Sequence, residues 1–120
     1  MLVDDELDIL TVFKTGLERY GFRVDAFAEP DQAVASFKPS YYDLVVLDIR
    51  MPQLSGFQVA KLLWQADPAT KVCFLTAFEI YEEEANKVFK DFNTKCFVKK
   101  PIGIEALVRH IESHFQIVSQ

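Results

Sequence analysis

The sequence predicts an α/β fold in which one parallel sheet is covered by helices on both faces. Short apolar runs alternate five times with segments of helical periodicity along the 120 residues. No internal repeat, low-complexity segment or linker interrupts this alternation. Strands that alternate with helices form parallel sheets, because each helix crosses one face of the sheet to reach the next strand. We therefore expect a single domain over residues 1–120, with five strands and five helices.

The first two predicted strands lie on either side of a helix. Leu2-Val3 is the first apolar run, and the acidic segment Asp4-Asp5-Glu6 follows it. Apolar residues then recur at helical spacing from Leu10 to Tyr20, and Gly21 stands where a helix would end. Residues 22–27 alternate between apolar and polar, which is typical of a half-covered strand at the edge of a sheet.

The middle of the chain predicts the centre of the sheet. A short helix beginning at Pro30 leads into Leu44 to Leu47, an uninterrupted apolar run. Such a run is typical of a strand that is buried on both faces. The next helix begins at Ser55 or Gly56 and is closed by Asp67-Pro68.

The last third of the chain predicts two more strands and two helices. Val72 to Leu75 is a second buried strand, and the acidic residues between Glu79 and Glu84 precede or begin a helix that runs through Phe92. Phe97-Val98 is the last strand. The final helix runs from Ile104 to about Val118.

The composition excludes several classes of protein. The formal net charge of -5 would repel the phosphate backbone of a nucleic acid, so direct nucleic-acid binding is not expected. No apolar stretch reaches the ~20 residues of a membrane helix, and the first residues lack the pattern of a signal peptide. We expect a soluble, cytoplasmic protein that does not bind membranes.

No metal-binding or catalytic role is expected for the two cysteines and the two histidines. Cys73 and Cys96 lie in apolar, strand-like runs without the spacing of a metal site, so we expect two reduced core residues rather than a disulfide. His110 and His114 lie one turn apart on the last predicted helix. A solvated helix face is favoured there over a metal-binding pair.

Polar residues of different kinds end four of the apolar runs. They are Asp4-Asp5, Asp48, Thr76 and Lys100. The carboxyl ends of parallel strands share one edge of the sheet, and ligands bind in the crevice there. Three crowded carboxylates must either take up a proton or bind a cation. Oxygen ligands of this kind suit Mg²⁺, which can also contact phosphate oxygens.

This polar group predicts phosphoryl chemistry. Asp48 ends the most buried strand and is the best candidate nucleophile, since a carboxylate can attack a phosphoryl donor to form an acyl phosphate. Asp4 and Asp5 would hold the metal. Thr76 could donate a hydrogen bond to a phosphoryl oxygen, and Lys100 could stabilise the charge that spreads over these oxygens.

The motifs that carry these residues resemble the receiver domain of two-component response regulators. The matching segments are Val3-Asp4-Asp5-Glu6, Leu47 to Pro52 with Gly56, Thr76-Ala77 and Lys100-Pro101. The resemblance covers residues 1–118, although Met1-Leu2-Val3 is shorter than the first strand of similar domains. It implies a flavodoxin-like doubly wound sheet with the strand order 2-1-3-4-5.

The resemblance also implies roles for the site residues. Asp48 would accept a phosphoryl group from the phosphohistidine of a sensor histidine kinase or a phosphotransfer protein. Asp5, Asp48 and the backbone carbonyl of Arg50 would ligate Mg²⁺, and Asp4 would act through a bound water. Slow self-phosphorylation and self-dephosphorylation are expected, but no true enzyme activity.

Further residues would contact the phosphoryl group or transmit its presence. The resemblance implies that Thr76 and Lys100 contact it and that Thr76 turns inward once it is there. Phe97 matches the family's aromatic switch position, but it could equally be a permanently packed core residue. Helix four, strand five and helix five would form the surface that contacts an output protein or domain. The sequence leaves open whether the chain forms a homodimer.

Three other functions are alternatives. A Mg²⁺-dependent phosphatase with an aspartyl nucleophile would usually carry a second acid where Arg50 stands. A flavin or nucleotide carrier would usually have a glycine-rich loop after the first strand, and no glycine lies between Val3 and Phe13. A receiver-like binding module that takes no phosphate is disfavoured by intact Asp48, Thr76 and Lys100.

Overall fold

The computed structural model describes residues 1–77 and 96–115 of the chain. Five parallel strands form one sheet in the order β2-β1-β3-β4-β5, which confirms the predicted order and fold class. The strands are β1 (Leu2–Val3), β2 (Ala26–Phe27), β3 (Val45–Asp48), β4 (Val72–Thr76) and β5 (Phe97–Lys99).

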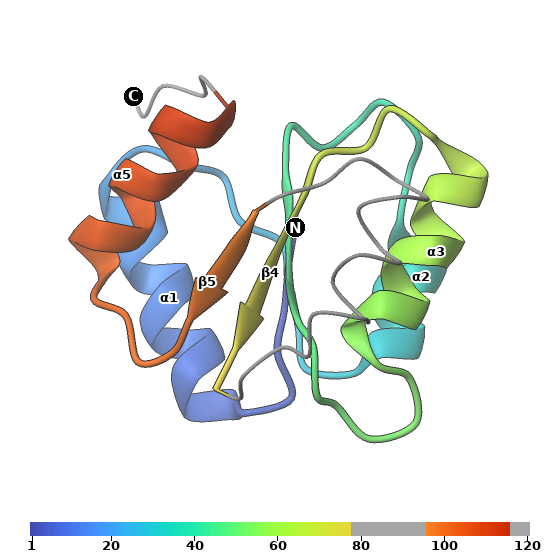
Figure 1. The fold of residues 1–120 in the computed structure, drawn as a ribbon, viewed down its shortest axis with the longest axis horizontal. Coiled ribbons are helices and arrows are strands. Elements are labelled where there is room, and N and C mark those ends of the chain that lie inside the picture. Colours follow the sequence, from blue (N-terminus) through green and yellow to red (C-terminus); the bar gives the residue numbers. More distant parts are fainter. Residues whose placement is uncertain (78–95, 116–120) are drawn as a thin grey trace.

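Helices cover both faces of this sheet. Figure 1 shows α1 and α5 side by side on one face, and α2 and α3 on the other. The helices are α1 (Leu7–Arg19), α2 (Pro30–Ser36), α3 (Gly56–Ala66) and α5 (Ile104–Phe115). The helix predicted to run through Phe92 lies outside the described residues. Within the described ranges, no helix is long and apolar enough to cross a membrane.

The strands β3 and β4 separate two apolar layers. Every residue of β3 and β4 is buried, as the uninterrupted apolar runs predicted. Val45 and Leu47 pack with α3 on one face, whereas Val46 packs with α1 and α5 on the other. This alternation follows from the two-residue period of a strand. The site residues at the strand ends are therefore held by two packed layers.

The second strand is much shorter than predicted. Only Ala26 and Phe27 pair with β1, because β1 itself offers only Leu2 and Val3 for pairing. The predicted strand over residues 22–27 is therefore wrong for its first part. The alternating pattern has another cause, since Phe22 and Val24 pack partly buried against the layer that contains α1 and α5.

The start of α3 is held against the end of β3. Ser55 caps the helix: its hydroxyl accepts a hydrogen bond from the Gln58 backbone N–H at 3.2 Å, and the Gln58 side chain accepts one from the Ser55 N–H at 2.8 Å. The Gly56 N–H donates to the Ile49 carbonyl at 2.8 Å. A Cβ on Gly56 would collide with the carbonyl oxygen of Asp48. Glycine thus allows α3 to begin directly beside Asp48.

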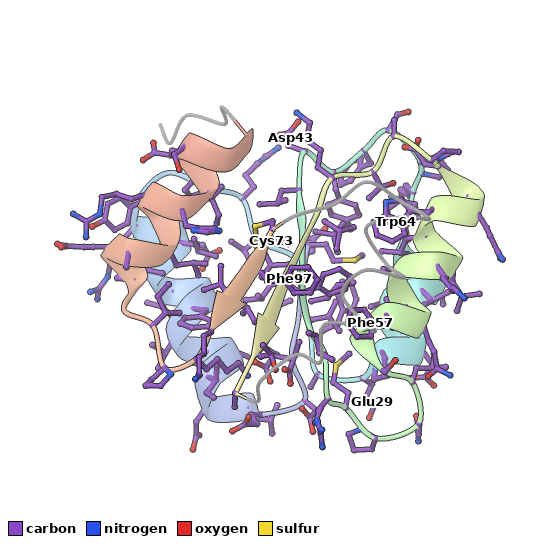
Figure 2. All side chains as sticks on the ribbon, in the orientation of Figure 1. Glu29, Asp43, Phe57, Trp64, Cys73 and Phe97 are labelled. Atoms are coloured by element: carbon purple, nitrogen blue, oxygen red, sulfur yellow. A yellow bond between two sulfur atoms is a disulfide. The ribbon has the colours of Figure 1, made fainter. Side chains whose placement is uncertain are left out.

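The prediction of two unlinked thiols is wrong, because Cys73 and Cys96 form a disulfide between β4 and the residue that precedes β5. Figure 2 marks Cys73 at the sheet. The parallel register pairs Phe74 with Phe97, so the two preceding residues lie side by side with their Cα atoms 4.7 Å apart. The sequence did not reveal this pair because 23 residues separate the cysteines along the chain.

Candidate functional site

The polar residues predicted at the strand ends meet at one edge of the sheet. Asp4 follows β1, Asp48 ends β3, Thr76 ends β4 and Lys100 follows β5. Their exposed fractions are 0%, 4%, 5% and 7%, and they are the buried polar or charged residues in the described part of the chain. Buried polar side chains are rare unless they are paired or functional. This group is therefore the candidate site.

Lys100 is the cation at the centre of the group. Its Nζ donates to Asp4 Oδ2 at 2.7 Å and lies 3.6 Å from both Asp48 Oδ1 and Glu6 Oε1. Burial lowers the pKa of Lys100, but the hydrogen bond to Asp4 and the neighbouring negative charges outweigh it, so the pKa is raised. Lys100 is therefore charged at neutral pH. The adjacent Lys99 is exposed.

The surroundings of Asp48 strongly shift the pKa of its carboxyl group. Its pKa is raised to about 7, mainly by burial and next by the negative charge of Asp4. The positive charge of Lys100 acts in the opposite direction, whereas the charge and hydrogen bond of Asp5 add to the rise. The carboxylates thus carry more negative charge than Lys100 neutralises. A second cation would relieve this excess.

The segment after β1 positions the other acidic side chains. Asp4 Oδ1 accepts a hydrogen bond from the Glu6 backbone N–H at 2.9 Å, which fixes the turn that leads into α1. Asp5 is half-buried and interacts with Asp48, so the predicted residues come together. Sequence reasoning gave no role to Glu6. Its only signal was its place in the acidic run, where the start of α1 turns its side chain toward the site.

The oxygen atoms present fit a hard divalent cation. Carboxylate oxygens of Asp4, Glu6 and Asp48 lie within 4.8 Å of one another, and Asp5 lies beside Asp48. Carboxylates supplemented by water are the usual ligands of Mg²⁺. Burial and the neighbouring carboxylates raise the pKa of Asp48, so a cation at this edge would stabilise its charged form. The donor set and the charge both suit such an ion.

The remaining predicted residues lie around this group. The Thr76 carbonyl accepts a hydrogen bond from the Lys100 backbone N–H at 2.7 Å, which joins the ends of β4 and β5. Phe97 is half-buried between the sheet and α3, where its ring centroid lies 5.2 Å from that of Phe74 and 6.4 Å from that of Phe57 (Figure 2). Arg50 is exposed in the loop after β3.

The doubly wound sheet and its acidic edge define the class to which this chain belongs. The family described as "Response regulator receiver domain" matches residues 1–112, and the chain is a member of that family. Receiver domains of response regulators are the phosphoacceptor switches of two-component signalling systems.

Individual relatives share this architecture. The chain is 32% identical to the alkaline phosphatase synthesis transcriptional regulatory protein PhoP of Bacillus subtilis over 93% of its length, but spans only 49% of that protein. The structure of the non-phosphorylated HemR receiver domain of Leptospira biflexa is similar with a TM-score of 0.85 and 25% identity, covering 99% of this chain and 94% of that one. The structure titled "BeF3 Activated DrrB Receiver Domain" has a TM-score of 0.80 and 26% identity, covering 97% and 95% of the two chains.

Proposed function

We propose that residues 1–120 form one receiver domain in which Asp48 accepts a phosphoryl group from a phosphohistidine. The donor would be a sensor histidine kinase or a phosphotransfer protein. The observation that supports this most is the buried position of Asp48 beside a second carboxylate and 3.6 Å from the Lys100 ammonium. A cytoplasmic location is part of the same proposal.

The transfer needs no general base. A carboxylate oxygen of Asp48 attacks phosphorus, the bond from phosphorus to the donor imidazole nitrogen breaks, and an aspartyl phosphate forms. The leaving imidazole keeps the electron pair of the broken bond. Because the pKa of Asp48 is about 7 without a metal, a nearby cation would increase the fraction of the reactive carboxylate at neutral pH.

The acidic residues would hold Mg²⁺. Asp5, Asp48 and the backbone carbonyl of Arg50 are the proposed direct ligands, and Asp4 would act through a water. When bound, the ion would supply positive charge to the phosphoryl oxygens. Glu6 is a further candidate at the rim, because its carboxylate lies in the same oxygen cluster.

Lys100 and Thr76 would bind the transferred group. Lys100 is charged and already lies within the acidic cluster, so it could exchange part of its contact with Asp4 for a phosphoryl oxygen. The Thr76 hydroxyl would donate a hydrogen bond to another oxygen. The backbone hydrogen bond between these two residues supports their acting together.

The conformational change caused by phosphorylation would reach the protein surface at the edge of the sheet that carries β5. Phe97 lies on this strand and packs on Phe74, so a movement of Thr76 at the end of β4 could alter its packing. We propose that Phe97 is part of the switch and that the surface including β5 and α5 contacts an output protein or domain. The curated relatives about twice as long as this chain are transcriptional regulators, which supports an output of that kind.

Phosphorylation by a small donor tests the proposal. The protein is incubated with Mg²⁺ and acetyl phosphate, and its intact mass is measured. We expect one added phosphoryl group in the wild type and in the Asp8→Asn control, since Asp8 is an exposed residue of α1. Asp48→Asn should gain none. Failure of the wild type to be modified by acetyl phosphate or by any phosphohistidine donor would contradict the proposal.

A further inference from the structure

We propose that Cys73 and Cys96 are a reversible thiol and disulfide pair, and that their oxidation speeds phosphorylation of Asp48 by holding β5 against β4. The first part stands independently, whereas the second part rests on the proposed function. The pair lies outside the acidic site, on the face of the sheet that α1 and α5 cover.

The sheet itself places the two sulfur atoms together. Cys73 lies in β4 and Cys96 directly precedes β5, and the Phe74 N–H donates to the Cys96 carbonyl at 2.9 Å. Both cysteines have an exposed fraction of 0%. The backbone therefore keeps the two thiols adjacent in the reduced protein as well. The disulfide can then form again without a large movement of either strand.

An imidazole lies beside the pair. His110 of α5 has a ring nitrogen within 4.8 Å of both sulfur atoms, and the residue is half-buried. Its predicted place on a solvated helix face is therefore wrong. A neighbouring imidazole or imidazolium favours the thiolate, which is the form that reacts with disulfides. His110 thus gives the buried pair a chemical feature that ordinary core cysteines lack.

The surroundings favour oxidation over metal binding. The two sulfurs and His110 offer three ligands, whereas closed zinc sites in proteins generally have four. Within the described part of the chain, no fourth His, Cys, Asp or Glu joins these three, and the other buried residues of this layer are apolar. They are Leu2, Leu10, Phe13, Leu17, Val46, Leu75, Val98, Leu107, Val108 and Ile111.

The position at the sheet edge gives a route for reagents. Within the described chain, β5 pairs only with β4 and has three residues. Opening such an edge costs less free energy than unfolding the whole sheet. A small disulfide could then react with one cysteine thiolate and release one small thiol. The second cysteine would displace the other small thiol, so that two electrons and two protons pass from the protein to the small disulfide.

The strands connect this pair to the acidic site. Cys96 precedes β5 and Lys100 follows it, while Thr76 ends the strand that contains Cys73. The cross-link fixes one end of this strand pair, and the hydrogen bond from Lys100 to the Thr76 carbonyl joins the other end. Restraining β5 therefore keeps the Lys100 ammonium in place beside Asp48. A preorganised cation accelerates a transfer in which negative charge is redistributed.

Thiol titration tests the pair without reference to phosphorylation. The full chain is equilibrated in buffers of reduced and oxidised glutathione, and free thiols are alkylated in denaturant and counted by intact mass. We expect two thiols in reducing buffers and none in oxidising buffers, with the native protein passing reversibly between them. Cys96→Ala should retain its single protein thiol or form only a mixed disulfide. Cys73→Ala is the reciprocal variant.

Three outcomes would overturn the proposed redox pair, two from this titration and one from adding Zn²⁺ to the reduced protein. The first is two free thiols in every buffer, and the second is a bond that a dithiol cannot reduce in the folded protein. The third is tight binding of one Zn²⁺ by the reduced wild type that is lost in Cys96→Ala, which would assign the cluster to a metal. Since the single variants retain the other cysteine, either one suffices if its counterpart fails to fold.

The coupling is tested by the rate of phosphorylation with Mg²⁺ and acetyl phosphate. We expect the oxidised wild type to react about three- to tenfold faster than the reduced protein. The double variant Cys73→Ala/Cys96→Ala should react at one rate in both buffers. Equal rates for the oxidised and reduced wild type would overturn the coupling. If neither state is phosphorylated while the thiol titration succeeds, the proposed function and the coupling fail together, but the redox pair stands.

Discussion

Asp48 combines burial with a close group of like charges. Its raised pKa means that the folded protein binds this proton more tightly than the unfolded chain does. Between the unfolded value of 3.8 and the folded value of about 7, raising the pH therefore costs stability. Above about pH 7 the loss of stability is complete, because the buried carboxylate of Asp48 is then charged in the folded protein.

Replacing Asp48 should remove this pH dependence. Without divalent metal, we expect Asp48→Asn to be more stable than the wild type by about 1 to 3 kcal/mol at pH 8, and by much less at pH 4. Urea unfolding at both pH values measures the difference. The exposed Asp8→Asn variant serves as the control. Identical pH profiles for the wild type and Asp48→Asn would contradict the assigned environment of this carboxyl.

Lys100 should matter for stability as well as for phosphorylation. Lys100→Met leaves the fully buried Asp4 without its 2.7 Å partner, and breaking a buried pair in this way typically costs about 3 to 5 kcal/mol. The matched control is Lys99→Met, because Lys99 is the exposed neighbour and should change stability by less than about 0.5 kcal/mol. Chemical unfolding of both variants checks this. Equal losses of stability in Lys100→Met and Lys99→Met would show that the ion pair with Asp4 does not cause the destabilisation.

The positions of single site residues could be predicted where they lie at the carboxyl ends of strands. Asp4, Asp48, Thr76 and Lys100 were found because strand ends of a parallel sheet converge. Glu6 was missed, since its approach depends on how the chain turns into α1. His110 was misplaced because helical spacing alone does not say which residues α5 turns toward the sheet.

Among the elements, α3 is fixed to the site by its first residue. Gly56→Ala should be strongly destabilising, by more than about 2 kcal/mol, since the new methyl group meets the backbone of Asp48 and lies 2.9 Å from the Cα of Ile49. Gly103→Ala is the control, because a Cβ there meets no atom within 4 Å. Thermal or urea unfolding compares the two variants.

The Gly56 substitution should also disturb the site, because moving α3 displaces the end of β3. A lower rate of phosphorylation in the folded Gly56→Ala protein would be the expected companion effect. A Gly56→Ala variant as stable as Gly103→Ala would contradict the close approach of α3 to β3.

The bounds of helices were predicted best where a capping residue or a glycine marks the end of the helix. The start of α3 followed from Ser55, and Gly21 with its positive φ of 93° follows the end of α1. The length of β2 was overestimated because strand length depends on the partner strand. The bond between Cys73 and Cys96 was missed for a related reason, since it depends on the register of two strands that lie far apart in sequence.

At the scale of the whole molecule, alternation of strands and helices was sufficient to predict the fold. The uninterrupted apolar run from Leu44 to Leu47 also predicted the centre of the sheet, since β3 is the middle strand and all four of its residues are buried. The roles of the site residues rest on chemistry that the fold makes accessible, and they stay predictions until they are measured.

Binding of Mg²⁺ should stabilise the whole domain. A ligand that binds only the folded state at about ten times its Kd adds about 1.4 kcal/mol to the free energy of unfolding. We expect this gain in the wild type and a much smaller one in Asp5→Asn, which removes a proposed ligand. Urea unfolding with and without Mg²⁺ gives the result. An equal gain in both proteins would place the ion elsewhere.

The location of the phosphoryl group tests the central claim most directly. After reaction with acetyl phosphate and Mg²⁺, proteolytic fragments are analysed by tandem mass spectrometry. The account predicts that the phosphoryl group lies on Asp48, and that no fragment of the Asp48→Asn protein carries one. A phosphoryl group on another residue of the wild type, or equal labelling of Asp48→Asn, would contradict it.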